Sequence, residues 1–204
     1  MRLALVMVLA LSCTGCAGSL LGPSGEAPGI YRLEVADAAG EAVRLPLALG
    51  VARPRAAASL DTERIAVVQP DNRFDHYAGV RWSEPAPQML QAVVVRVLQS
   101  DGRYEVVVAT PNRVPTDLLL DLELRRFEAV YAAGGAAPSV RVEFQATLVD
   151  PRQVRRVSSM VASSEVAAGD NRRDAVLDAY QRATAEAVHA LAAWLRELEP
   201  NPAR

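Results

Sequence analysis

Hydrophobic and polar residues alternate most regularly in the second half of the chain. Over residues 117–127 the even positions from 118 to 124 are leucine, and charged residues alternate with them from position 121. Residues 140–148 repeat the alternation, and a third run, 154–166, follows the Asp150-Pro151 turn. Because successive side chains of a strand point to opposite faces, such runs are typical of strands buried on one side. They predict an antiparallel meander with one buried and one polar face.

An amphipathic helix is predicted before this meander. Apolar residues recur three and four positions apart between Met89 and Leu98, which is the spacing of one helix face. Ser83 can cap this helix, and Glu84 and Pro85 suit its first turn. Asp101-Gly102 ends it.

A longer helix is predicted at the end of the chain, over residues 172–198. Asp170 or Asn171 can cap its first turn, and Pro200 stands just beyond its end. Its apolar residues form one stripe at helical spacing, so we expect this helix to lie across the sheet.

Shorter apolar runs complete the predicted sheet, with turn residues such as Pro70-Asp71-Asn72 between them. These runs are residues 30–35, 45–52, 64–69, 74–80 and 104–109. Together the elements predict an α+β fold, a mostly antiparallel sheet with a long three-strand meander, covered by two principal helices. We expect a single domain over residues 30–199, followed by a tail at 200–204.

The start of the chain is typical of a lipoprotein export signal. Arg2 provides a positive charge, residues 3–11 are apolar, and small residues lead to Cys16. The apolar run is shorter than the roughly 20 residues that a membrane-spanning helix needs, and it matches the central region of a cleaved signal. Residues 1–15 are therefore predicted to be a signal peptide, with Cys16 as the lipidated residue.

Cys13 and Cys16 compete for the lipidated position. Cys16 is favoured because Gly15 precedes it and small residues follow it. The alternatives are a disulfide between the two cysteines and an ordinary secretory signal. The residue after Cys16 is Ala17 and not aspartate, which by the enterobacterial sorting pattern implies the outer membrane. Residues 16–29 are expected to form a flexible tether, since glycine, proline and serine are frequent there.

Composition excludes several classes of function. All 22 basic residues are arginine, so the chain has no lysine for a phosphate-binding loop or a Schiff base. The net charge of -2 provides no basic excess, which argues against nucleic-acid binding.

No set of residues points to catalysis or to a metal. The two histidines, His76 and His189, belong to no recognisable ligand set, whereas zinc needs three or four converging ligands. Ser24 lacks the strand-turn-helix setting of a nucleophile elbow. Asp121 and Glu123 share one strand face and could act as acid and base, but neighbouring charges favour an ion-pair ladder. We expect no catalytic residue, no metal and no cofactor.

The segment from Leu60 to Leu90 carries patterns of a known family. Around Leu60-Asp61-Thr62-Glu63-Arg64-Ile65, Tyr77 and Arg81-Trp82-Ser83-Glu84-Pro85, the chain resembles the ABC-type transport auxiliary lipoproteins. An early tyrosine strand and a late tryptophan in the last helix stand in the family's order, so the resemblance covers nearly the whole mature chain. The motif residues, either structural or partner-binding, are Arg81, Trp82, Pro85, Met89 and Leu90. Trp82 is expected to anchor the core rather than to contact lipid.

The resemblance implies a role in mammalian-cell-entry-type lipid transport in Gram-negative envelopes. The partner would be a periplasmic protein of the cell-entry type, whose inner-membrane complex contains a permease and an ATPase. By this resemblance the chain is a docking component and not an enzyme, lipid-anchored at the periplasmic face of the outer membrane. Two alternatives stay open: a periplasmic lipid carrier, which needs a cavity of about 300 to 1,000 Å³, and a periplasmic hydrolase using His76 or the acidic strand pair.

Overall fold

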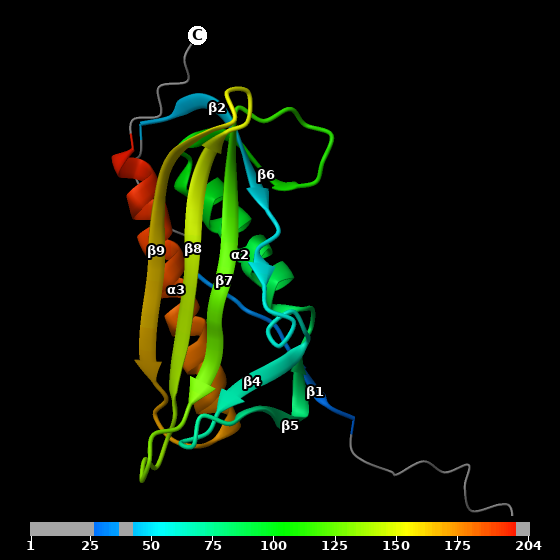
Figure 1. Ribbon diagram of the computed structural model, residues 1–204, viewed down its shortest axis with the longest axis vertical. Coiled ribbons are helices and arrows are strands. Elements are labelled where there is room, and N and C mark those ends of the chain that lie inside the picture. The colour runs from blue at the N-terminus through cyan, green and yellow to red at the C-terminus, as the bar shows by residue number, and fades with distance from the viewer. Residues whose placement is uncertain (1–26, 37–42, 199–204) are drawn as a thin grey trace, which may run out of the picture.

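The computed structural model describes residues 27–36 and 43–198, which form one α+β unit (Figure 1). In this part of the chain nine strands form one sheet, and two helices, α2 (Ala86–Asp101) and α3 (Arg173–Glu197), cover one face of it. The predicted fold class is confirmed. The predicted signal peptide, Cys16 and the tether up to residue 26 lie outside the described residues.

The predicted meander is confirmed as three long antiparallel strands, β7 (Leu118–Val130), β8 (Ser139–Asp150) and β9 (Arg155–Ala167). The even positions of β7 from 118 to 124, and of β8 from 140 to 148, are at most 2% exposed. A bulge between Leu124 and Arg126 shifts the pattern by one residue. The shift brings Phe127 and Ala129 to the buried face.

The sheet forks beside β7, because three short strands share the edge that β8 leaves free. β2 and β6 form the upper branch, whereas β4, β5 and β1 form the lower branch (Figure 1). Most of these short pairings are parallel; the pairing of β4 with β5 is antiparallel. Alternation along the sequence predicted most of the strands but not these neighbours or the two-residue β3. The bounds are β1 (Gly29–Tyr31), β2 (Leu45–Ala52), β3 (Arg55–Ala56), β4 (Arg64–Val68), β5 (Phe74–Trp82) and β6 (Tyr104–Thr110).

The first strand is shorter than the run 30–35 predicts. β1 pairs with Val80, Arg81 and Trp82, which are the last three residues of β5. Since β5 ends there, no strand continues beside the residues that follow Tyr31, and the chain leaves the sheet. Leu33 and Val35 are buried nonetheless.

The prediction that Ser83 caps the first helix is wrong. α2 begins at Ala86 with Pro85 in the capping position and no side-chain cap. Ser83 is still tied to the sheet, because its N–H donates to the Tyr31 carbonyl at 2.6 Å. The N–H of Ala86 instead donates to the Thr62 carbonyl at 3.2 Å. The predicted end is confirmed, with Gly102 in the left-handed conformation at φ 72°.

The cap predicted for the last helix is also wrong. Arg172 occupies the capping position of α3 and makes no side-chain cap. Asp170 stabilises the turn before the helix, where its Oδ1 accepts from the Arg172 N–H at 2.7 Å. Asn171 Oδ1 accepts from the Tyr131 hydroxyl at 2.5 Å. Both candidate side chains therefore bind other donors.

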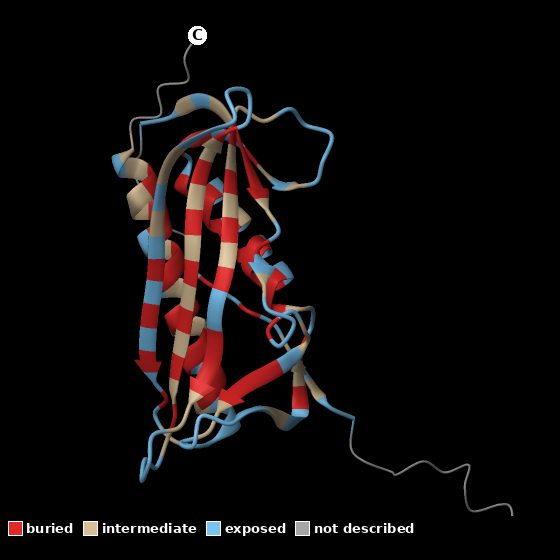
Figure 2. Ribbon diagram, in the orientation of Figure 1, coloured by how far each residue is buried: buried red, intermediate tan, exposed pale blue. Residues whose placement is uncertain are grey.

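The core lies between the inner face of the sheet and the two helices (Figure 2). As predicted, the apolar stripe of α3 lies across the sheet, against β8 and β9, while α2 packs on β6 and β2. Large side chains from both layers, such as Leu120, Phe144, Tyr180 and Leu191, are fully buried. Each of these leucine and phenylalanine side chains contributes about 1.5 to 3 kcal/mol of hydrophobic stabilisation. Over the described ranges, neither helix has the length and apolar character that crossing a membrane requires.

Candidate functional site

The motif tryptophan stands at the centre of an aromatic cluster. Trp82, at the end of β5, is 1% exposed, and its ring centroid lies 5.6 Å from that of Phe127 and 5.2 Å from that of Tyr180. The rings of Phe127 and Tyr180 are 5.1 Å apart. Aromatic pairs at such separations add to the energy of burial itself. Trp82 therefore joins β5, β7 and α3 inside the core, in agreement with the expected anchoring position.

The two sequence patterns around residues 60–65 and 81–85 lie side by side. The backbone N–H of Trp82 donates to the Glu63 carbonyl at 2.7 Å, and the Arg81 guanidinium pairs with the Glu63 carboxylate. These contacts fix the point where β5 ends and α2 begins. The structure thus gathers the five motif residues at one junction, with Met89 and Leu90 buried on the first turns of α2.

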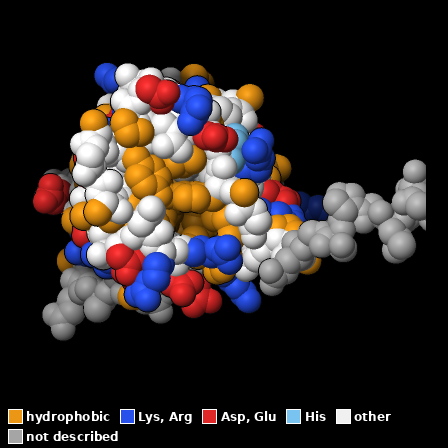
Figure 3. Space-filling model, turned by 90° about the horizontal axis from the view of Figure 1, so that it is seen from below, with side chains coloured by type: hydrophobic (Ala, Val, Ile, Leu, Met, Phe, Trp, Pro, Cys, Tyr) orange, Lys and Arg blue, Asp and Glu red, His pale blue; other side chains and the backbone are white. Residues whose placement is uncertain are grey.

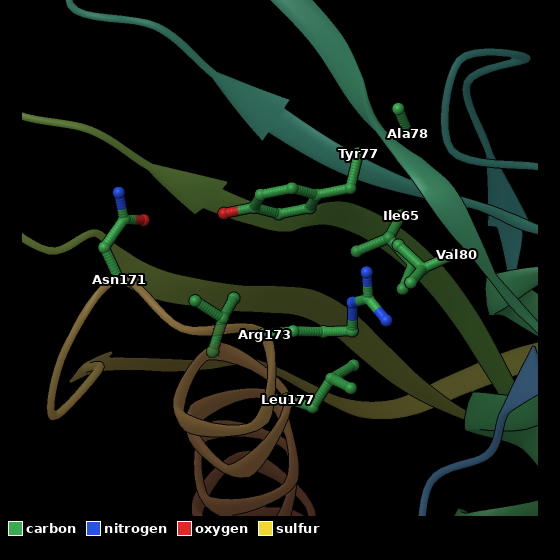
Figure 4. Close-up of a pocket in the computed structure, with 8 residues that line it drawn as sticks. Ile65, Tyr77, Ala78, Val80, Asn171, Arg173 and Leu177 are labelled. Atoms are coloured by element: carbon green, nitrogen blue, oxygen red, sulfur yellow. The ribbon is translucent and has the colours of Figure 1, made fainter. Parts of the chain in front are cut away.

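An apolar pocket opens where β4 and β5 meet the start of α3 (Figure 4). Its volume is about 190 Å³, and its apolar lining comes from Ile65, Tyr77, Val80, Val176 and Leu177. Seen from this end of the molecule, hydrophobic side chains gather in a hollow with charged side chains around it (Figure 3). A cavity of about 150 Å³ is known to take one benzene ring. The pocket therefore has room for one apolar side chain.

Polar groups stand at the mouth of this pocket. The Tyr77 and Tyr131 hydroxyls are 3.0 Å apart, and Tyr131 donates in turn to Asn171. Burial, followed by the hydrogen bond to Tyr131, raises the pKa of Tyr77, so this phenol stays neutral. Arg173, the exposed first residue of α3, adds a cation at the rim. The site combines an apolar floor with one positive charge.

A wider hollow of about 550 Å³ lies beside β1. Charged and polar side chains contribute most of its lining, among them Arg32, Glu34, Glu84 and Gln181. Pockets that enclose organic ligands are lined predominantly by hydrophobic and aromatic groups. The hollow beside β1 is therefore suited to water and ions rather than to acyl chains.

The two histidines occupy different elements. His76 on β5 has a buried Nε2, and burial, with a smaller effect of Arg64, lowers the pKa of its imidazole. His189 on α3 places its Nε2 3.1 Å from the Ala36 carbonyl. Within residues 27–36 and 43–198, no group of three or more His, Cys, Asp or Glu side chains could hold a metal ion.

Asp121 and Glu123 belong to an ion-pair ladder on the polar face of the sheet. Arg55 lies 3.1 Å from Asp121, and Arg125 lies 3.8 Å from Glu123. On the neighbouring strands β8 and β9 an ion pair between Arg141 and Glu165, at 2.9 Å, continues the ladder. Exposed pairs of this kind contribute about 0 to 1 kcal/mol each. The predicted ladder is confirmed, and each carboxylate has a cation beside it.

The pocket was not predicted from the sequence. Its lining comes from strands and a helix at distant positions in the chain. Periodicity predicts which face of each element is buried, but not where two buried faces fail to meet. Ile65 and Tyr77, which both belong to the family pattern, were the signals available.

Comparisons with known proteins place the chain in a family. The sequence model for the ABC-type transport auxiliary lipoprotein component matches residues 31–192. The crystal structure of protein XCC0632 from Xanthomonas campestris, assigned to the DUF330 family, has 28% identity and a TM-score of 0.75, covering 81% of this chain and 93% of that one. An uncharacterized protein has 16% identity and a TM-score of 0.64, covering 83% and 99% respectively.

A more distant likeness concerns the fold alone. The hypothetical protein CT253 from Chlamydia trachomatis has 9% identity and a TM-score of 0.50, covering 74% of this chain and 98% of that one. No curated protein matches the sequence. Since the family match spans most of the chain, the protein belongs to the ABC-type transport auxiliary lipoprotein component family.

Proposed function

We propose that this auxiliary lipoprotein is a non-catalytic docking component of a mammalian-cell-entry-type lipid transport system. Cys16 would anchor it at the periplasmic face of the outer membrane. Its partner would be the periplasmic cell-entry-type protein, whose inner-membrane complex supplies the permease and the ATPase. Family membership supports the part in ABC-type transport, and the export signal supports the anchor.

The observation that carries the docking role is the pocket formed by Ile65, Tyr77, Val80, Val176 and Leu177. Its 190 Å³ match one side chain and are less than the roughly 300 Å³ at which ligand pockets begin. The space between sheet and helices is filled by the core, so burial favours a rigid body over a lipid carrier. Interfaces gain most of their energy from a few anchor residues, chiefly Trp, Tyr and Arg, that fill well-packed pockets.

The test is to add a charge at the rim of the pocket without disturbing the core. Ala78 is exposed and lies at the pocket edge on β5. Ala78→Arg in the detergent-solubilised full chain should weaken binding of the cell-entry-type protein at least about tenfold, or about 1.4 kcal/mol. Gln153→Arg, in the exposed turn between β8 and β9 at the opposite end of the molecule, is the matched control.

Both variants should melt at the temperature of the parent protein. Equal binding by the two variants would remove the pocket from the docking surface. Phospholipid that purifies in equimolar amount with the parent and is lost from Ala78→Arg would replace docking by a carrier function.

A further inference from the structure

The outer edge of β9 has no strand beside it in the part of the chain that the structure describes. Within the described ranges β9 pairs with β8 alone and forms one margin of the sheet (Figure 1). The Ala168 N–H donates to the Pro138 carbonyl on the β8 side, at 2.9 Å. Because backbone groups of successive residues alternate between the two edges of a strand, the odd positions from 159 to 167 point away from β8. The Ala167 carbonyl agrees with this direction, since it accepts from Arg182 of α3 at 3.2 Å.

This edge has few of the features that keep natural sheet edges from pairing. Edge strands are commonly short or carry lysine, other charges or proline. β9 is 13 residues long, and its residues 157–164 contain neither a charge nor a proline. Val161, in the middle of this stretch, is 50% exposed. The strand is therefore available to another strand.

We propose that β9 pairs antiparallel with β9 of a second copy of this chain, around a twofold axis at Val161. In this register the two Val161 side chains face each other, and Ser159 faces Ser163 of the other copy. The backbone groups of odd positions then bond across the axis, and the sheets of both copies become continuous. The strand is self-complementary because its uncharged centre is flanked by charges of opposite sign.

The charges at the two ends of β9 support this register. The β9 bulge near Val157 places Arg156 opposite Val149, so Arg156 and Glu165 both extend from the polar face. With Val161 on the axis, counting alone would place Glu165 of one copy opposite Val157 of the other. Because the bulge leaves Val157 without an opposite residue, Arg156 takes that place and faces Glu165. Glu165 already accepts from Arg141 and Ser139, and a carboxylate has about four acceptor positions.

Other registers lose this match. Moving the axis by one residue toward Ala162 would place Glu165 opposite Ser159 and Val161 opposite Ser163. The pairing surface is separate from the pocket beside β5, so this inference does not depend on the proposed docking partner.

A disulfide across the axis tests the register directly. Opposed residues of a hydrogen-bonded antiparallel pair have Cα atoms about 5.5 Å apart, within the 4.4 to 6.8 Å that disulfides span. The full chain carrying Val161→Cys, oxidised in its native envelope, should give a reducible product of twice the mass of one chain. The parent protein should not give this product.

Ser159→Cys is the matched control, because its opposite residue is Ser163. Alone it should stay monomeric, whereas Ser159→Cys with Ser163→Cys should cross-link. Absence of the Val161→Cys dimer, or equal cross-linking by Ser159→Cys alone, would overturn the proposal. A disulfide of Val161→Cys to a different protein would do so as well, because it would assign the edge to a strand of another chain.

A second measurement does not require a cysteine. Arg156→Glu and Glu165→Arg, each alone in the detergent-solubilised full chain, should lower the dimer fraction in a mass measurement. Mixing the two variants should restore a dimer, because each pair then regains opposite charges. Failure of the mixture to recover, with both variants folded, would contradict the pairing.

Discussion

Trp82 meets Tyr180 edge-on, with ring centroids 5.2 Å apart and ring planes at 80°. The Tyr180 hydroxyl donates to the Ala66 carbonyl of β4 at 2.8 Å. Tyr180 of α3 therefore contacts β5 through Trp82 and β4 through Ala66, and β4 also contributes Ile65 to the pocket. The aromatic cluster fixes the relative positions of the elements that form the candidate docking site.

Truncation of the motif tryptophan should therefore act on stability. Trp82→Ala removes the ring that contacts Phe127 and Tyr180, and we expect a loss of about 3 to 5 kcal/mol in the free energy of unfolding, measured in urea. Trp82→Phe, which keeps an aromatic ring, should cost less. Partner binding should fall only as far as unfolding explains. An unchanged urea midpoint with lost partner binding would make Trp82 an interface residue instead.

Alkaline pH should unfold the protein through its buried phenols. In the folded protein, burial raises the pKa of Tyr77, Tyr104 and Tyr180. In the unfolded chain, phenols ionise at about pH 10. The stability that these groups contribute is present below that pH and is lost as pH rises above it. Since the chain has no lysine, tyrosines are the main groups that titrate there. Melting temperatures should fall steeply above about pH 10, and less steeply in Tyr180→Phe; a flat profile would contradict the assignment.

Much of the fold was predictable because its long elements carry strong periodicity. The alternation in β7 and β8 and the stripe of α3 follow from which face each element buries. The caps were missed for a physical reason: the N–H of Ala86 is satisfied by the Thr62 carbonyl, and Ser83 donates to β1. A partner supplied by a distant segment leaves no local signal in the sequence.

The candidate site was predictable only in part. The family pattern identified Trp82 and Tyr77, but their surroundings depend on how β4, β5 and α3 meet. The parallel pairing of β4 with the end of β7 positions this corner, and strand alternation contains no information about pairing partners. The sequence pattern predicts which face of each element is buried. A pocket forms where the buried faces of different elements no longer contact each other, and the pattern does not contain that information.

Lipidation should depend on one thiol. Cys16→Ala should abolish palmitate labelling and release the protein into the soluble periplasmic fraction, because the acyl chains predicted on Cys16 would be its membrane anchor. Cys13→Ala should leave labelling and fractionation unchanged. Labelling that survives in Cys16→Ala and disappears in Cys13→Ala would assign the anchor to the other cysteine.

The histidines should be dispensable for function. His76 and His189 lie on different elements. Among the described residues the buried Nε2 of His76 has no hydrogen-bond partner, and the Nε2 of His189 lies 3.1 Å from the Ala36 carbonyl. In a strain that lacks the gene, the double variant with alanine at both positions should correct the envelope-permeability defect to the same extent as the parent protein does. A folded, normally abundant double variant that fails to complement would favour a catalytic or metal-dependent role.

The docking role is tested most directly by a photo-reactive amino acid at Ala78 of the full chain in its native envelope. Position 78 lies at the pocket edge, and the same group at Gln153 serves as the control at the opposite end of the molecule. We predict that illumination cross-links position 78, and not position 153, to the periplasmic cell-entry-type protein. Cross-linking of neither position to that protein, or of position 153 alone, would contradict docking through the pocket.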